Sequence, residues 1–314
     1  MNINVFGIHK ALRLYKLVGQ QTYKYPKAAR VAFEKLANIL PANNSKCKYS
    51  LTTIEGVEAE WIIPENCRSE KVMLFFHGGG FATGSIHTHR ALASQIAIQA
   101  EVKALSVNYR LAPETKFPAQ LDDTLLAYKF LLRIGFKSEN IVLAGESAGA
   151  NLTAATLLKI RDNDLPMPKA AILLSAWLDL TNSGKSVMEN KDKDPMVPYK
   201  GLELWAQNYA GKNNLSSPYA SPLLADLQGL CPIYMQVGDC EVLLDDSVRF
   251  AKKAKEAGVE VKLEIWHDMF HAWQGFWMIL PEGREANKNI GKYIKEKLGI
   301  TKSIHEKEAI KNFA

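Results

Sequence analysis

Cysteine is scarce in this sequence of 314 residues, which contains four. The four form neither a CxxC pair nor a Cys/His cluster at the spacing of metal ligands, so neither a zinc site nor a disulfide scaffold is indicated. Scattered reduced thiols are typical of cytosolic proteins, and we expect no bound metal. The cysteines are Cys47, Cys67, Cys231 and Cys240.

Long apolar runs are also absent, and no segment approaches the length of a membrane span. The first 26 residues, MNINVFGIHKALRLYKLVGQQTYKYP, have no continuous apolar core and no small-residue cleavage site. We therefore do not interpret them as a secretory signal. These absences predict a soluble, cytoplasmic protein without a membrane-spanning segment.

The sequence has no dense run of lysine and arginine interleaved with aromatic residues. Its formal net charge is a modest +6, which we interpret as a solvated surface rather than a face that binds nucleic acid. Hydrophobic residues make up 47% of the chain, enough for a large core. We expect one domain with an attached cap and no nucleic-acid partner.

What the sequence does contain is an alternation of short apolar runs and amphipathic stretches from about residue 50 onward. Residues 72–76, VMLFF, are apolar throughout, as expected for a strand buried on both faces. Such alternation predicts an α/β fold with a mostly parallel central sheet flanked by helices. The expected strands are 57–63, 72–76, 103–108, 141–143, 170–174, 233–237 and 261–266, and the expected helices are 91–100, 119–134, 148–160, 246–257 and a last one containing Ile290, Tyr293, Ile294 and Leu298.

Two segments depart from this alternation and are predicted to form a cap on the α/β domain, which spans residues 46–300. Residues 1–45 carry two amphipathic helical stripes, and residues 180–225 form an irregular, aromatic-bearing insertion between strands. The alternative for the first segment is an ordinary pair of packing helices. The charged tail, 301–314, is expected to fray. The stripes consist of Ile8, Leu12, Leu14, Tyr15 and Val18, and of Val31, Phe33, Leu36, Ala37 and Leu40.

The pentapeptide GESAG at 145–149 follows an expected strand and opens an expected helix, which is the context of a nucleophile elbow. Its two glycines permit a sharp turn that lifts the hydroxyl of Ser147 clear of the sheet edge, and the helix N-terminus directs N–H groups toward it. The alternative is a glycine-rich turn with an N-cap serine. The flanking strand and helix make Ser147 the candidate nucleophile.

A glycine run, HGGGF at 77–81, comes directly after the buried strand at 72–76. Acyl transfer passes through a tetrahedral oxyanion, and the N–H groups of glycines can donate to it because no Cβ blocks the approach. The alternative is a flexible turn, for which three glycines after a buried strand would be an unusual choice. We interpret the run as part of an oxyanion hole.

Together these motifs resemble the hormone-sensitive-lipase-like α/β-hydrolases, the bacterial family IV esterases. The resemblance covers about residues 50–295 and implies the α/β-hydrolase fold, with a helical cap built from the N-terminal helices and an insertion after the sixth core strand. It implies that Gly79, Gly80 and Ala148 donate to the oxyanion, and that a homodimer through the strand at 261–266 is possible. The resemblance rests on HGGGF at 77–81, YRLAPE at 109–114 with FPA at 117–119, GESAG, the acidic loop near 241 and His271.

A general base is expected in the loop after a late strand, where two histidines compete. His267 precedes His271 by four residues, and the family pattern places the base at the later one, before a small residue and an aromatic residue. We therefore predict that His271 is the base. The other histidines are expected to be structural or superficial: His77 anchors the glycine loop, and His87 and His89 lie on the surface.

Two carboxylates compete as the acid that orients this histidine. The resemblance places Glu241 in the acidic position, where most relatives carry aspartate. Asp239 is the rival, because it directly follows a glycine at the end of a strand. We predict Glu241 and keep Asp239 as the alternative. Asp245 and Asp246 are better explained as N-cap and first-turn acids of the next helix.

The remaining motif residues have no evident reaction step. Arg110 and Glu114 are interpreted as structural ions that tie loops together. Four aromatic side chains are candidates for an acyl or alcohol pocket, with plain core packing as the alternative. They are Phe81, Trp205, Tyr209 and Trp273.

The resemblance implies a serine carboxylesterase that works through an acyl-enzyme, with Ser147 attacking the carbonyl and His271 moving the proton. No cofactor is implied, and the expected partner is a small, apolar ester with a short to medium acyl chain. One alternative is an amidase or peptidase with the same triad. Another is a non-catalytic ligand receptor on the same fold, against which the retention of Ser147, His271 and an acid argues.

Overall fold

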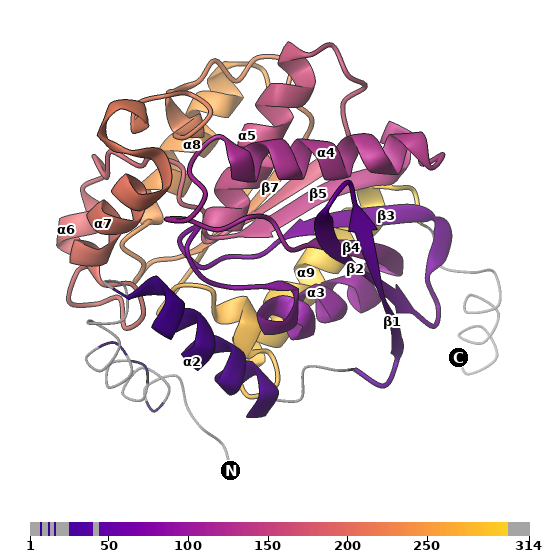
Figure 1. Cartoon of the computed structure of the whole chain (residues 1–314), viewed down its shortest axis with the longest axis horizontal. Coiled ribbons are helices and arrows are strands. Elements are labelled where there is room, and N and C mark those ends of the chain that lie inside the picture. The colour runs from indigo at the N-terminus through magenta and orange to yellow at the C-terminus, as the bar shows by residue number, and fades with distance from the viewer. Residues whose placement is uncertain (1–6, 8–11, 13–15, 17–24, 40–43, 301–314) are drawn as a thin grey trace, which may run out of the picture.

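The computed structural model describes residues 7, 12, 16, 25–39 and 44–300 (Figure 1). One eight-stranded sheet, in the order β1-β2-β4-β3-β5-β6-β7-β8, is covered by helices on both faces, which confirms the predicted α/β-hydrolase fold class. All neighbouring strands from β4 to β8 are parallel. The strands are β1 (Cys47–Ile54), β2 (Val57–Pro64), β3 (Arg68–Phe76), β4 (Val102–Val107), β5 (Ile141–Glu146), β6 (Ala170–Leu174), β7 (Ile233–Gly238) and β8 (Val261–Trp266).

Alternate residues of β3 enter two separate cores, one on each face of the sheet. Leu74 and Phe76 pack with the apolar sides of α4, α5 and α8, whereas Met73 and Phe75 pack with those of α3 and α9. Successive side chains of a strand point to opposite faces, so an unbroken apolar run is what a central strand needs. The helices of the described residues are α2 (Pro26–Ile39), α3 (Ile86–Ala100), α4 (Ala119–Arg133), α5 (Ala148–Asp162), α6 (Ser186–Glu189), α7 (Tyr199–Ala210), α8 (Leu244–Glu256) and α9 (Pro281–Lys297).

Two of the differences from the prediction have a clear local cause. β1 is not among the predicted strands; it forms an antiparallel hairpin with β2 through Glu55 and Gly56, whose φ angles of 49° and 92° suit a tight hairpin turn. Helix α3 begins at Ile86 rather than at residue 91, because the Ser85 side chain accepts hydrogen bonds from the N–H groups of His87 and Thr88. In both places the missed signal is turn or cap chemistry rather than hydrophobic periodicity.

The predicted cap segments are partly described. Helices α2, α6 and α7 lie at the same end of the molecule (Figure 1), and residues 180–225 contain two helices, where we expected irregular structure. Val31 is wrongly placed in the second apolar stripe, because its side chain is 55% exposed, whereas Leu12 of the first stripe packs against the cluster around Phe270. Ile8, Leu14, Tyr15, Val18, Leu40 and the tail 301–314 lie outside the described residues.

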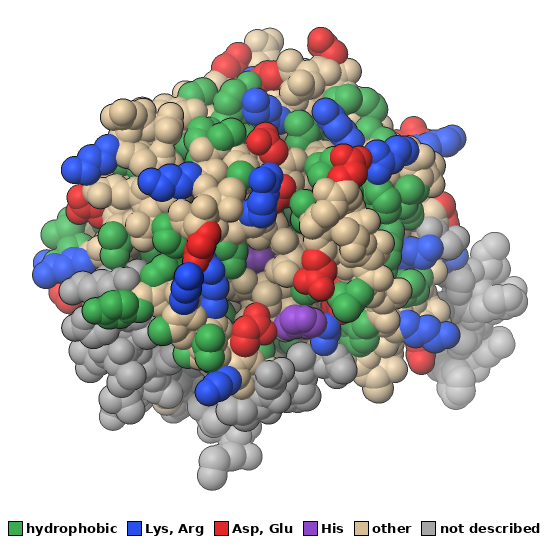
Figure 2. Space-filling model, viewed as in Figure 1, with side chains coloured by type: hydrophobic (Ala, Val, Ile, Leu, Met, Phe, Trp, Pro, Cys, Tyr) green, Lys and Arg blue, Asp and Glu red, His purple; other side chains and the backbone are tan. Residues whose placement is uncertain are grey.

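The parallel strands direct their carboxyl ends to one edge of the sheet, where the loops after β3, β5, β6, β7 and β8 meet. Ligands of open parallel sheets bind outside this edge. Over the face in Figure 2, acidic and basic side chains are interspersed rather than gathered by sign. Among the helices of the described ranges, none has the length and apolar character of a membrane span. The four cysteine thiols are all free.

Candidate active site

Ser147 lies at a sharp turn between β5 and α5. Its backbone has φ 56° and ψ −118°, a conformation that non-glycine residues rarely adopt and that persists where the surrounding structure enforces it. The turn brings α5 against the end of β3, since a Cβ on Gly149 would lie 2.0 Å from the carbonyl oxygen of Phe76. The elbow therefore needs glycine at position 149 and places the serine beside the glycine loop.

His271 joins Ser147 to Glu241 in one line of hydrogen bonds. Its Nε2 lies 2.9 Å from Ser147 Oγ, and its Nδ1 lies 2.9 Å from Glu241 Oε2. The side chain of Glu241 is fully buried, and Ser147 and His271 are 7% and 6% exposed. A nucleophile held by a base, which is held in turn by an acid, is the arrangement of a catalytic triad.

The competing residues, Asp239 and His267, face one another at the surface. Asp239 Oδ2 lies 2.8 Å from His267 Nδ1, and the His267 side chain is 86% exposed. With Asp268 they bring possible metal-ligand atoms within 4.8 Å of one another, a cluster that the sequence analysis missed because its members follow two different strands. The imidazole of His267 contacts Asp239 through one ring nitrogen and Asp268 through the other. We interpret these three residues as a surface group of ion pairs.

The electrostatics of His271 favour its protonated form. Burial alone lowers the pKa of this imidazole, but the hydrogen bond and charge of Glu241, with the charge of Glu146, outweigh it and raise the pKa to about 9. The Oε1 atom of Glu146 lies 3.4 Å from His271 Nε2. An imidazolium formed beside Ser147 is therefore stabilised by carboxylates at both ring nitrogens.

The N–H groups of Gly79, Gly80 and Ala148 make no hydrogen bond among the described residues. Backbone donors in largely buried surroundings are almost always paired, so these three unpaired N–H groups are candidates for holding an oxyanion. His77 holds the loop as expected: its Nδ1 lies 2.8 Å from the Gly78 carbonyl oxygen, and its ring stacks on Tyr109. Burial lowers the pKa of His77 to about 3, so the ring is neutral.

His89 is not a surface residue, contrary to the prediction, whereas His87 is exposed. The Nε2 atom of His89 lies 3.2 Å from Glu146 Oε2 and 3.3 Å from the N–H of Gly78. It thus holds the carboxylate that approaches His271. The sequence signal for this contact is only that Glu146 directly precedes the serine.

The four aromatic residues expected to line a pocket lie in different environments. Phe81 and Tyr209 are fully buried and stack on one another, with ring centroids 3.7 Å apart. Trp273 is buried in a separate cluster with Met269, Phe270, Leu280 and Ala286. The half-buried ring of Trp205, on α7, is the one that reaches the glycine loop, since a Cβ on Gly80 would lie 3.1 Å from it.

The segment that precedes α7 holds the loop of Glu241 in place. The side-chain amide of Asn190 donates to the carbonyl oxygens of both Asp239 and Glu241, at 3.0 and 2.9 Å. The buried carboxylate of Asp194 accepts from the N–H of Val242 at 3.0 Å. The insertion therefore fixes the backbone on both sides of Glu241, a role that the sequence analysis did not foresee.

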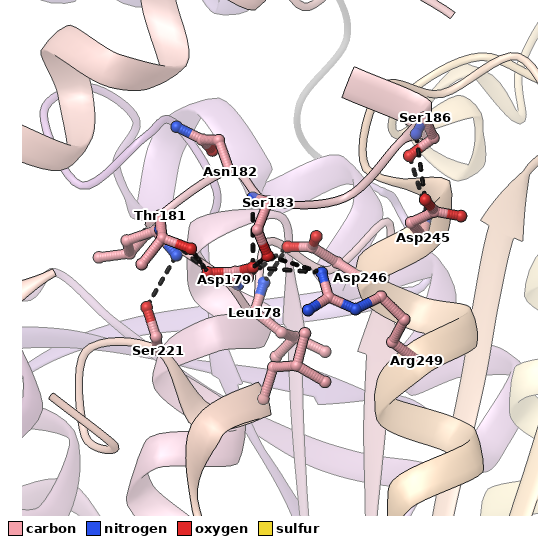
Figure 3. A network of polar contacts seen from close by, with 12 residues as sticks. Leu178, Asp179, Thr181, Asn182, Ser183, Ser186, Ser221, Asp245, Asp246 and Arg249 are labelled. Atoms are coloured by element: carbon pink, nitrogen blue, oxygen red, sulfur yellow. Dashed lines mark hydrogen bonds and ion pairs between the residues drawn. The ribbon is translucent and has the colours of Figure 1, made fainter. Parts of the chain in front are cut away.

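A second polar network ties the loop after β6 to the start of α8 (Figure 3). Asp246 accepts hydrogen bonds from the N–H groups of Leu178 and Asp179, and Arg249 pairs with the Asp179 carboxylate. Burial, with the nearby charge of Asp179, raises the pKa of Asp246 to about 8. Asp245 accepts from the N–H of Ser186. Both aspartates lie in the first turn of α8, as predicted, but neither is its N-cap, which is Leu243.

The ions of the YRLAPE segment tie structural elements together, as expected. Arg110 forms a bidentate pair with Asp123 on α4. Glu114 pairs with Arg30 on α2, which also donates to the carbonyl oxygens of Ala82 and Ala112 at 2.7 and 2.6 Å. Through Arg30, helix α2 is anchored to the loop that follows the glycine run.

Comparison with known proteins agrees with this geometry. A family model for the alpha/beta hydrolase fold matches residues 73–275. The chain is 37% identical over 249 residues to an acetyl-hydrolase of Streptomyces hygroscopicus, covering 79% of this chain and 83% of that protein. It is 34% identical to an esterase of Acinetobacter venetianus, covering 85% of this chain and 88% of that protein.

Solved structures give the same result. EstE5, in a crystal soaked with p-nitrophenyl butyrate, superposes with a TM-score of 0.89 at 39% identity, covering 94% of this chain and 98% of that one. An esterase from the bacterial hormone-sensitive lipase family superposes with a TM-score of 0.85 at 41% identity, covering 87% and 92%. The chain therefore belongs to the α/β-hydrolase family, among the esterases of the bacterial hormone-sensitive-lipase group, and it is a carboxylic ester hydrolase.

Proposed function

We propose that the chain hydrolyses short-chain carboxylic esters through a triad of Ser147, His271 and Glu241. The observation that carries the proposal is the unbroken line from Ser147 Oγ to His271 Nε2 and from His271 Nδ1 to Glu241, at 2.9 Å each. Asp239 is turned to the surface and does not contact His271, which supports Glu241 as the acid.

In the first step Ser147 Oγ attacks the ester carbonyl carbon while its proton passes to His271 Nε2. The oxyanion is held by the N–H groups of Gly79, Gly80 and Ala148, and Glu241 stabilises the imidazolium. His271 then gives the proton to the leaving alkoxide. Water attacks the acyl-enzyme, with His271 as base again, and releases the carboxylic acid. Each loss of one oxyanion donor costs about 3 kcal/mol in the barrier.

We further propose an acyl chain at the short end of the expected range, acetyl included. One relative is named an acetyl-hydrolase. The Trp205 ring lies against Gly80 and limits the space beside the oxyanion donors, while Phe81 and Tyr209 fill the adjacent interior by stacking on one another. Space is therefore restricted where the acyl group of a bound ester would lie.

The N-terminal helices and residues 180–225 act, in this proposal, as a cap over the site. Arg30 of α2 contacts Ala82 in the loop after the glycine run, and Trp205 of α7 lies beside Gly80. β8 is an edge strand of the sheet, and its Ile265 is 52% exposed. We propose that a homodimer forms through this strand. Light scattering of the purified protein tests the dimer.

The test of the proposed function is Ser147→Ala together with fluorophosphonate labelling. The wild type should be labelled at Ser147 and should hydrolyse p-nitrophenyl acetate and butyrate faster than octanoate. The variant should be folded, unlabelled and inactive. Unlabelled wild type would indicate a ligand receptor, and faster turnover of matched anilides than of esters would indicate an amidase.

A further inference from the structure

Ser175 lies directly after β6, between the strand that leads to Ser147 and the strand that leads to Glu241. Its side chain is fully buried. Nothing in the sequence patterns marks this serine, and the proposed mechanism does not use it. Its position alone places it at the edge of the sheet where the triad is assembled.

The hydroxyl of Ser175 joins the acid to the loop of the base. It donates to Glu241 Oε1 at 2.8 Å, while the other carboxylate oxygen faces His271. The same hydroxyl accepts from the N–H of Ala272, the residue after His271, at 3.1 Å. One side chain therefore contacts both partners of the proposed acid–base pair.

The backbone at both ends of this link is strained. Ser175 has φ 46° and Ala272 has φ 58°, left-handed values that cost energy for residues other than glycine. Such conformations persist where the surrounding structure fixes them, and they cluster at functional sites. Here they allow the hydroxyl of Ser175 and the N–H of Ala272 to meet.

We propose that Ser175 is a positioning residue of the esterase. Its hydroxyl fixes both the orientation of the Glu241 carboxylate and the position of the loop that carries His271. The inference rests on the proposed Ser147–His271–Glu241 triad and deepens it. The carboxylate oxygen that turns away from His271 has two donors, the Ser175 hydroxyl and the N–H of Gly238 at 2.7 Å. Two donors from different strands fix the plane of a carboxylate, whereas one leaves it free to rotate.

Loss of the hydroxyl should act on turnover and not on substrate binding. The hydrogen bonds that the structure shows for the Ser175 hydroxyl join it to Glu241 and Ala272, and neither belongs to the proposed oxyanion donors, so we expect a bound ester to keep its contacts. Misplacement of a catalytic group by about 1 Å costs on the order of 100-fold in rate. We therefore expect Ser175→Ala to lower kcat by about 10-fold to 100-fold with KM unchanged.

The experiment compares Ser175→Ala, Ser175→Gly and Ser94→Ala, with kcat expressed per active site titrated by fluorophosphonate. Glycine adopts φ 46° without strain, so Ser175→Gly folds readily and still lacks the hydroxyl. Ser94, on α3, is the control: it is also buried, and its side chain is hydrogen-bonded to Tyr49 on β1. We expect both Ser175 variants to lose kcat equally and Ser94→Ala to keep it.

The pH dependence gives a second readout that simple destabilisation would not move. A carboxylate with one donor fewer attracts the imidazolium more strongly, so the acid limb of kcat/KM should move to higher pH in both Ser175 variants. Wild-type kcat in Ser175→Gly, with an unmoved limb, would overturn the proposal. Glu241→Gln distinguishes failure of the proposed triad from failure of the role of Ser175. If Glu241→Gln is fully active, the triad assignment is wrong. If Glu241→Gln is inactive while the Ser175 variants are fully active, only the role of Ser175 is wrong.

Discussion

Glu146 approaches His271 from the side of Ser147, with its Oε1 atom 3.4 Å from the Nε2 that also contacts the serine. Both nitrogens of the imidazole therefore face carboxylates, since Nδ1 faces Glu241. The Glu146 carboxylate is held by His89 at 3.2 Å and is almost fully buried. Its charge is placed where it stabilises protonated His271 and so delays the loss of that proton as pH rises.

Glu146→Gln should shift the pH dependence of the reaction. Only neutral His271 can accept the serine proton, so wild-type kcat/KM should fall as pH drops through about 9, the raised pKa of His271. Removing the charge of Glu146, one of the three carboxylates that raise the pKa of His271, should move this acid limb down by about one pH unit. A pH profile on one activated ester measures it, with Glu139→Gln, at the other end of β5, as the control. An unmoved limb would show that Glu146 does not act on His271.

Substitutions at the two rival acids should give opposite results. Glu241→Gln should lower kcat by about 10⁴-fold, as loss of a triad acid does in the serine-protease template. Asp239→Asn should have little effect, because its carboxylate pairs with exposed His267. Glu241→Asp should keep partial activity, since only the reach of the side chain changes. Inactive Asp239→Asn with a nearly normal Glu241→Gln would reverse the assignment.

Trp205→Ala should relax the preference for short acyl chains. The ring lies against Gly80, and its removal opens space beside the oxyanion donors. Because one methylene in an apolar pocket is worth about 1–3 kcal/mol, the octanoate-to-acetate ratio of kcat/KM should rise about 10-fold or more. Glu203→Ala, an exposed position on the same helix, is the matched control. An unchanged ratio would place the acyl chain elsewhere.

Arg30→Ala and Glu114→Gln should destabilise the protein unequally. The first removes two hydrogen bonds to carbonyl oxygens as well as an ion pair, and should cost about 2–3 kcal/mol. The second removes only the charge of a partly exposed carboxylate, worth about 0–1 kcal/mol. Denaturant titration measures both. Equal losses would mean that the carbonyl contacts of Arg30 contribute nothing to the anchoring of α2.

Asp246→Asn should make the folding stability of the protein fall less steeply as pH rises. The pKa of Asp246 is about 8 in the folded chain, against an ordinary value of 3.8, so the folded state holds its proton more tightly. The resulting stability is complete below about pH 4 and lost as pH rises toward 8. Asparagine does not ionise, so the melting temperature of Asp246→Asn should exceed that of the wild type by a margin that grows between pH 5 and 8. A constant margin would contradict the raised pKa.

The sequence indicated the three residues of the proposed triad, which the structure places in one line of hydrogen bonds, because each lies in a motif with a recognisable neighbour. Ser147 is framed by two glycines, His271 precedes a small residue and an aromatic one, and Glu241 occupies the position implied by the resemblance. The parallel sheet then brings the ends of β5, β7 and β8 together. Motifs of this kind can be recognised in a sequence because residues that are neighbours along the chain define them.

The contacts of Glu146, Ser175 and Asn190 could not be predicted in the same way. Each depends on which strand ends are neighbours in space and on how far a side chain reaches across a loop. The pocket aromatics show the same limit, since composition does not distinguish the half-buried Trp205 from the fully buried Trp273. Packing decides such cases, and packing is a property of the whole chain.

The attachment of the Glu241 loop to Asn190 and Asp194 has a consequence for protein engineering. In this chain the first part of the insertion is also a scaffold for the loop of Glu241, the proposed acid. A chimera that replaces residues 180–225 as a block would discard that scaffold and import one shaped for another loop. If the proposed cap role is correct, we expect grafts that begin after Asp194 to change substrate preference while the loop of Glu241 keeps its contacts.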